Sequence, residues 1–253
     1  MSFPHFSFRF LPITSSTNAV LKNQVQSGEM LFGALAAGEQ TAGRGRGENT
    51  WISPFGGVYV SVAAPIDDPT RLYLKGPHIA VEVVRWLKAR FSLDARIKWP
   101  NDFLVADRKL GGMLLELVRS PQGMLVVVAG IGMNVHVTPM IPTRRMFLPT
   151  SLSEWVDVSC VSVETLAQKV AQLAFDALIG SPNPVEILDF HRRYSATLGR
   201  RVQVALPGGQ QVIGQAVDFT SDFRLCVETE FGVLNVQAGD CWHEPTDCMR
   251  INV

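Results

Sequence analysis

Two periods of hydrophobic and polar positions run along the chain and predict a mixture of helices and strands. From 73 to 91, apolar residues recur near helical spacing, which predicts a long amphipathic helix. An earlier helix, from about 18 to 26, is predicted by the polar cluster Ser15-Ser16-Thr17-Asn18. Short polar side chains accept hydrogen bonds from the free amides of a first helical turn. Gly28 is expected to end this helix.

Runs of apolar and β-branched residues predict the strands of a sheet. The high apolar density at 110–118 and 124–137 indicates two central strands that are covered on both faces. The segment 39–51 is instead rich in glycine and polar residues without periodicity, and it predicts a loop. The other strands predicted here lie at 31–38, 57–63 and 95–99, and further helices are predicted at 151–156, 162–179 and 184–194.

The pattern changes after Gly199. Short apolar runs separated by turn residues such as Pro207-Gly208-Gly209 predict a compact module that resembles a β-barrel. Its strands are expected at 202–206, 211–219, 225–229 and 234–238. We therefore predict an α/β (α+β) chain of two domains. A mixed central sheet with packed helices is expected at 1–197, and a small all-β domain at 198–253.

The composition narrows the possible functions. The chain has 253 residues, of which 47% are hydrophobic and 18% charged, so a sizeable core can form. Its 23 basic and 23 acidic residues balance, so no general field attracts nucleic acid and any preference for anions is local. The longest apolar stretch, 124–129, is too short to span a bilayer, and the N-terminus lacks the features of a signal peptide. We expect a cytoplasmic protein.

The cysteines and histidines argue against a metal centre. The four cysteines form no Cys-x-x-Cys pair, and we interpret them as free thiols in a reducing compartment. The five histidines are scattered, which argues against a structural zinc site. The cysteines are Cys160, Cys226, Cys241 and Cys248.

Two arginines stand in the predicted loop, in the stretch Gly43-Arg44-Gly45-Arg46. Glycine lets a backbone approach a ligand closely, and arginine offers a fork of donors suited to carboxylate or phosphate. On its own the stretch also fits a solvated basic loop. It is not a Walker loop, because Gly-Lys-Ser/Thr is absent.

Two lysines stand in a second polar region. Lys98-Trp99-Pro100-Asn101-Asp102 ends a predicted strand at a proline turn, and strand ends often present site residues, although Asp102 alone also fits an ordinary turn. Lys109, before Leu110-Gly111-Gly112, either extends into solvent or is held for a bound anion. Further on, Gly130-Ile131-Gly132-Met133-Asn134 lacks the third glycine and the following helix of a dinucleotide fingerprint.

Together these motifs occur in one order: Ser16-Thr17-Asn18, 40–46 with Trp51, 98–102, 109–112 and 130–134. Over nearly its whole length the sequence resembles the biotin–protein ligases, and the Gly-Arg-Gly-Arg and Lys-Trp-Pro-Asn-Asp pair is the most specific part of the likeness. The resemblance implies a class II synthetase-like catalytic domain and a small SH3-like β-barrel. The motifs begin by residue 16, so we expect the monofunctional type without an N-terminal DNA-binding domain.

The resemblance implies an enzyme that joins biotin to ATP as biotinyl-5′-AMP and then transfers biotin to a lysine of a biotin carboxyl carrier protein. The expected partner is the carrier subunit of acetyl-CoA carboxylase. Mg²⁺ would accompany ATP, with Asp102 as an indirect contact, and the implied catalytic residues are Lys109 and Arg44. The implied biotin-binding residues are Ser16, Thr17, Asn18, Gln40, Arg44, Gly45, Arg46, Lys109 and Gly111. The implied ATP-binding residues are Arg44, Arg46, Trp51, Lys98, Asn101, Asp102, Lys109 and Asn134.

Two alternatives stay open. A lipoate– or octanoyl–protein ligase shares the catalytic fold, although the motif pair favours biotin. A non-catalytic biotin-binding protein is supported by Gly47-Glu48-Asn49-Thr50, where the family usually has a further glycine and a basic residue. This departure predicts weaker binding of the triphosphate. The sequence does not decide between a monomer and a homodimer, and a free sheet edge would suit either a second copy or the carrier protein. No nucleic-acid or membrane partner is expected.

Overall fold

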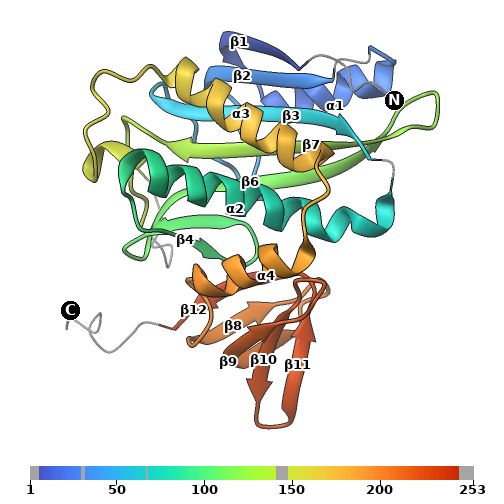
Figure 1. Cartoon of the computed structure of the whole chain (residues 1–253), viewed down its shortest axis with the longest axis vertical. Coiled ribbons are helices and arrows are strands. Elements are labelled where there is room, and N and C mark those ends of the chain that lie inside the picture. Colours follow the sequence, from blue (N-terminus) through green and yellow to red (C-terminus); the bar gives the residue numbers. More distant parts are fainter. Residues whose placement is uncertain (1–5, 30–31, 67, 141–147, 245–253) are drawn as a thin grey trace.

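A mixed seven-stranded sheet forms the larger part of the computed structural model, which describes residues 6–29, 32–66, 68–140 and 148–244 (Figure 1). Its strand order is β1-β2-β3-β7-β6-β5-β4. The β1–β2 pair is parallel and the other neighbours are antiparallel. The strands are β1 (Ser7–Thr14), β2 (Gly33–Gln40), β3 (Gly57–Pro65), β4 (Ala95–Lys98), β5 (Asp102–Val105), β6 (Arg108–Arg119) and β7 (Leu125–Asn134).

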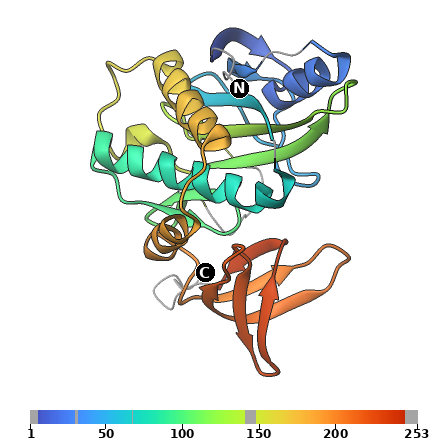
Figure 2. The same ribbon diagram turned by 45° about the vertical axis from the view of Figure 1, so that its right-hand side comes forward.

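Helices cover both faces of this sheet. On one face lie α2 (Leu72–Phe91) and α3 (Val163–Ile179), whose apolar residues pack with β3 and β7 in the main core (Figures 1 and 2). On the other face, α1 (Thr17–Ser27) packs through a smaller apolar cluster that includes Leu21 and Val25. The α1 helix begins at its N-cap, Ser16, and ends at Gly28, whose φ of 82° suits a residue without a Cβ.

A five-stranded antiparallel sheet follows, in the order β11-β10-β9-β8-β12. Between the two sheets lies α4 (Pro184–Arg193), and its His191 packs edge-on against Phe219 and Phe223 of the smaller sheet region (Figure 1). The strands are β8 (Arg201–Ala205), β9 (Gln211–Phe219), β10 (Leu225–Thr229), β11 (Gly232–Val236) and β12 (Asp240–His243).

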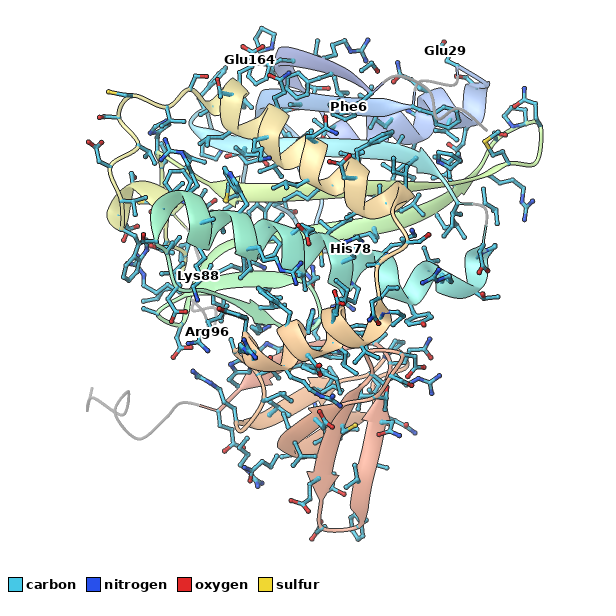
Figure 3. All side chains as sticks on the ribbon, viewed as in Figure 1. Phe6, Glu29, His78, Lys88, Arg96 and Glu164 are labelled. Carbon is cyan, nitrogen blue, oxygen red and sulfur yellow. The ribbon has the colours of Figure 1, made fainter. Side chains whose placement is uncertain are left out.

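Aromatic contacts join the outer layers. Phe6, just before β1, packs against Phe175 of α3, with ring centroids 5.1 Å apart. Lys88 and Arg96 lie over the ring of Tyr194, at 4.8 and 5.9 Å from its centroid. Figure 3 shows both cations near the end of α2 and the beginning of β4. These contacts fix α4 against the large sheet.

No helix of the described ranges is long and apolar enough to cross a membrane.

The predicted fold is confirmed: a mixed sheet with packed helices, followed by a small all-β region. Residue 31, the first of the strand predicted at 31–38, lies outside the described residues. Cys248 also lies outside them. The helix predicted at 151–156 is wrong. Only a single 3-10 turn forms there, at Leu152–Glu154, because the Ser151–Glu154 capping box supports one turn that ends at Trp155. Three strands were not predicted, namely β1, β5 and β12.

Candidate active site

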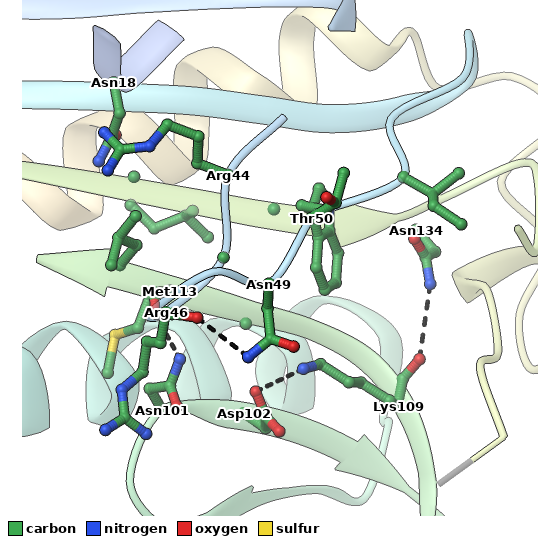
Figure 4. A pocket seen from close by; sticks show the side chains of 18 of the residues that line it. Asn18, Arg44, Arg46, Asn49, Thr50, Asn101, Asp102, Lys109, Met113 and Asn134 are labelled. Atoms are coloured by element: carbon green, nitrogen blue, oxygen red, sulfur yellow. Dashed lines mark hydrogen bonds and ion pairs between the residues drawn. The ribbon is translucent and has the colours of Figure 1, made fainter. Parts of the chain in front are cut away.

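A cavity of about 680 Å³ lies on the face of the large sheet that α1 covers, opposite α2 and α3. The N-terminus of α1 and the loop after β2 form one side of this cavity, and the ends of β4, β5 and β6 form another. Residues at the start of β12 complete the lining. The cavity therefore brings together segments from both ends of the chain, and Figure 4 shows the α1, loop and β6 side chains that face it.

One end of the cavity is polar and uncharged. The Thr17 amide and hydroxyl both donate to Gln40 Oε1, at 2.9 and 3.1 Å, while Gln40 Nε2 donates to Ser53 Oγ at 3.0 Å. The hydroxyl of Ser61 in β3 lies 2.7 Å from Thr17 Oγ1 and also contacts Asn18 Oδ1. These partners hold the side-chain amides in one orientation. The predicted trio at the start of α1 is thus assembled together with Gln40.

Two glycines of β7 and the loop allow this close assembly. A Cβ on Gly130 would lie 2.2 Å from Asn18 Oδ1, and one on Gly43 would lie 2.3 Å from the Trp51 carbonyl oxygen. Real Cβ atoms do not approach polar atoms so closely, so a side chain at either position would displace its neighbour. The glycines are required where the chain packs directly onto the sheet.

The Gly-Arg-Gly-Arg stretch forms a tight loop rather than an open one. The Gly45 amide donates to the Asn49 carbonyl at 2.7 Å, and Arg44 forms an isolated bridge with Thr50. Arg46 Nη1 donates to the carbonyl of Gly239 at 3.0 Å, just before β12, and lies 3.7 Å from the Asp240 carboxylate. Glu48, the departure seen in the sequence, is exposed and does not line the cavity, whereas Asn49 does.

Across the cavity from Arg44, the carboxylate of Asp102 lies beside Lys109 (Figure 4), and it also contacts Lys98. Asp102 Oδ1 lies 2.7 Å from Lys109 Nζ, and Asp102 Oδ2 lies 3.4 Å from Lys98 Nζ. Burial would raise the pKa of Asp102, but the charges and hydrogen bonds of Lys109 and Lys98 outweigh it and hold that pKa below its ordinary value. The carboxylate is therefore ionised at neutral pH, and it neutralises part of the local positive charge.

Trp51 and Asn134 carry buried polar atoms without a hydrogen-bond partner among the described residues. These atoms are Trp51 Nε1 and Asn134 Oδ1. Lys109 Nζ lies 5.3 Å from the centroid of the Trp51 ring, and a Cβ on Gly132 would lie 2.5 Å from Trp51 Nε1. Asn134 donates through Nδ2 to the Thr150 carbonyl at 2.8 Å. A buried unpaired donor and acceptor at a cavity wall favour a polar ligand.

Most of the predicted site residues line this one cavity. Gly111 does not, because it faces Phe103 on the other side of the sheet, and Gly112 lies at the cavity wall instead, near Asp102. Five further lining residues carry no signal in the sequence, because only the folded chain brings them to the cavity. They are Pro139, Pro149, Asp240, Cys241 and Trp242. Burial raises the pKa of the Cys241 thiol to about 11, so this thiol is not a ready nucleophile at neutral pH.

Comparison with known proteins agrees with this geometry. The sequence profile of the biotin/lipoate A/B protein ligase family matches residues 10–134. Over 239 residues the chain is 33% identical to the biotin–[acetyl-CoA-carboxylase] ligase of Mycobacterium tuberculosis, and the match covers 91% of this chain and 86% of that protein. The chain belongs to the biotin/lipoate A/B protein ligase family.

Other members of the biotin/lipoate A/B protein ligase family align less completely or match in structure. The bifunctional ligase/repressor BirA of Bacillus subtilis is 28% identical over 216 residues, which are 81% of this chain and 64% of that protein. The biotin protein ligase of Aquifex aeolicus in complex with biotin and ATP superposes with a TM-score of 0.70 at 25% identity, over 94% of this chain and 99% of that one. The Leishmania major biotin protein ligase in complex with biotinyl-5-AMP gives a TM-score of 0.60 at 25% identity, over 93% of this chain and 100% of that one.

Proposed function

We propose that the chain is an ATP-dependent biotin–protein ligase that makes biotinyl-5′-AMP and then biotinylates a carrier protein. The observation that carries this proposal is the cavity itself, in which an uncharged hydrogen-bonding end and a cationic region share one volume. A ureido ring requires the first, and the biotin carboxylate and the triphosphate require the second. The motifs that lie far apart in the sequence meet there.

The first reaction brings together two anions, the biotin carboxylate and the ATP triphosphate. A carboxylate oxygen attacks the α-phosphorus, an anhydride bond forms, and pyrophosphate leaves. Lys109, between Asp102 and Trp51, and Arg44, beside Asn18, supply fixed positive charge toward this centre (Figure 4). Such preorganised charge lowers the barrier because it needs no reorganisation as the reaction proceeds. Lys98 and Asn101 serve the nucleotide side.

In the second reaction the neutral amine of a carrier lysine attacks the acyl carbon, the acyl–oxygen bond breaks, and AMP leaves. The enzyme needs no nucleophile of its own. Beyond Met113, whose amide and carbonyl bond to Asn101, strand β6 pairs in the described structure only with β7, so the segment Leu114 to Arg119 offers a free strand edge beside the cavity. We assign this edge as the docking site of the carrier domain, because an added strand would bring a hairpin lysine to the cavity mouth. The acetyl-CoA carboxylase carrier is the proposed substrate.

Mg²⁺ enters this reaction as the counter-ion of ATP, as part of the substrate. The described residues contain no group of three or more carboxylate, histidine or cysteine side chains that would hold a metal ion. Asp102, the predicted indirect contact, is already bound by two lysines. The residues therefore do not fit a resident cation. The domain division at 197/198 and the cytoplasmic location stay predictions.

The deciding experiment is ATP-dependent transfer of labelled biotin to a purified carrier domain, with Lys109→Ala alongside. We expect transfer by the wild type and a loss of about 100-fold in the variant, the usual cost of removing one preorganised donor. Biotin binding without pyrophosphate release would favour the non-catalytic alternative. Transfer of lipoate in preference to biotin would favour the lipoate ligase. No binding of either acid would overturn the proposal.

A further inference from the structure

Glu116 in β6 belongs to none of the predicted motifs, but its side chain contacts residues of the site. Its Oε2 accepts a hydrogen bond from Asn18 Nδ2 at 3.0 Å, and its Oε1 accepts one from Lys22 Nζ at 2.6 Å. Arg44 Nη1 lies 3.2 Å from both oxygens. One carboxylate thus connects the first turns of α1 with the Gly-Arg-Gly-Arg loop. Burial would raise the pKa of Glu116, but these partners outweigh it and lower that pKa, so the group is ionised at neutral pH.

The carboxylate decides which way the Asn18 amide points. An ionised carboxylate only accepts hydrogen bonds, so the nitrogen of Asn18 must face Glu116 and its oxygen must face Ser61. The Thr17 hydroxyl already donates to Gln40, so Thr17 Oγ1 and Asn18 Oδ1 are both acceptors that share the one proton of the Ser61 hydroxyl. Without the charge of Glu116, the reversed amide would be equally acceptable. The polar end of the cavity would then present an exchanged donor and acceptor.

The same carboxylate holds Arg44 by one nitrogen. Among the described residues, Glu116 is the partner of the Arg44 side chain, and only Nη1 takes part. The Nε and Nη2 edge of the guanidinium remains available to a ligand. Arg44 lines the cavity and is 43% exposed, whereas Glu116 is 17% exposed, so the anchoring carboxylate is the more buried partner.

We propose that Glu116 is a positioning residue of the ligase site, which holds Arg44 over the cavity and fixes the orientation of the Asn18 amide. This inference rests on the proposed function for its meaning in catalysis, but the contacts it invokes exist in the unliganded chain. Lys22 provides a matched control, because it contacts the same carboxylate from α1 and does not line the cavity.

The test combines a readout of the loop with a readout of the ligand. Limited trypsin digestion of the unliganded protein reports how accessible Arg44 and Arg46 are to the protease. Calorimetry reports the affinity for biotin. In Glu116→Gln, which keeps the shape and removes the charge, we expect cleavage at these arginines about three to ten times faster and biotin affinity lower by a similar factor. Lys22→Gln is expected to match the wild type in both, and the thermal midpoint and circular dichroism serve as the check on folding.

Wild-type behaviour of Glu116→Gln in both measurements would overturn the proposal, and so would a Lys22→Gln variant that is equally impaired. If Glu116→Gln does not fold, Glu116→Asp takes its place. It keeps the charge but withdraws it by one methylene from Asn18 and Arg44, and wild-type values in that variant would overturn the proposal as well. Because trypsin cleavage needs no ligand, failure of the ligase function shows separately, as absence of biotin transfer by the wild type.

Discussion

Asp102 is the residue on which the cationic region of the cavity depends. Its side chain is 13% exposed, Lys98 is 7% exposed and Lys109 is 29% exposed, so the three charges interact with little solvent between them. A buried ion pair stabilises a fold only weakly as a whole, but loss of one partner leaves a buried charge without its compensation. Removal of the Asp102 charge should therefore lower the free energy of unfolding.

We expect Asp102→Asn to lower the free energy of unfolding by about 3 kcal/mol, because it removes the carboxylate that two lysines contact. Urea denaturation at pH 7 measures the change. Asp157→Asn is a suitable control, since Asp157 is exposed and accepts hydrogen bonds only from Ser159 in the described structure, and it should have little effect. Equal stability of Asp102→Asn and the wild type would show that the lysines do not need this charge.

The stability difference between the wild type and Asp102→Asn should depend on pH. The pKa of Asp102 is lower in the folded chain than its ordinary value of about 3.9. The unfolded state therefore takes up the proton first, and the advantage of the wild type over Asp102→Asn is fully present above pH 4. It should disappear as the pH falls through the lowered pKa. Denaturation curves of both proteins between pH 7 and pH 3 check this, and an advantage already lost at pH 6 would contradict it.

At the scale of elements, the glycines of β7 allow Asn18 and Trp51 to pack directly against this strand. Gly130→Ala would force Asn18 away, since its Cβ would lie 2.2 Å from Asn18 Oδ1. We expect the KM for biotin to rise about tenfold or more, the usual cost of one disturbed buried hydrogen bond. Gly76→Ala, inside α2, meets only ordinary contacts at 3.7 Å or more and should be equally active and slightly more stable. An unchanged biotin KM in Gly130→Ala would remove Asn18 from the proposed biotin end.

The α4 helix carries a second pH-dependent contact. His191 is 3% exposed between the rings of Phe219 and Phe223, and burial lowers its pKa to about 4. The unfolded chain protonates near pH 6.5, so stability is intact above that pH and falls between about pH 6.5 and pH 4. A difference of this size corresponds to roughly 3 kcal/mol. In His191→Leu, the free energy of unfolding lost between pH 7 and pH 4 should be smaller by about this amount. Urea denaturation at a series of pH values measures it. An identical slope would show that His191 does not titrate in this range.

At the scale of the whole molecule, the sequence pattern predicted the long elements, but it missed short or edge strands and the long-range contacts between elements. The helix at 73–91 and the central strands carry long periodic runs, and they form as predicted at α2, β6 and β7. The edge strand β1 is only half buried along its length, and β5 has four residues, so neither leaves a strong pattern. The cysteine, tryptophan and aspartate of β12 reach the cavity by a long-range contact that no local pattern encodes. Glu116 was overlooked for the same reason, since its partners lie up to 98 residues away.

The junction of the two sheets gives the last prediction. Trp99 is 3% exposed, its amide donates to Thr197 Oγ1 at 3.0 Å, and its indole Nε1 donates to the Phe223 carbonyl at 3.4 Å. It also stands between Lys98 and the Pro100-Asn101 turn, so one side chain supports both the junction and the part of the cavity that we propose binds the nucleotide. We expect Trp99→Ala to lower the free energy of unfolding by about 3–5 kcal/mol, as large-to-small core changes do. We also expect the affinity for ATP to fall more than that for biotin.

Calorimetry of unfolding and of ligand binding separates these effects. Trp86→Ala is the control, because Trp86 packs on Phe91 in α2 and does not line the cavity. It should lose stability and keep its affinity for ATP. If Trp99→Ala lost stability with ATP and biotin affinities unchanged, the junction would be a purely structural contact, and the smaller sheet would have no part in holding the nucleotide end. If ATP affinity falls selectively, the two sheets act as one binding unit, which the contact of Arg46 with Gly239 already favours.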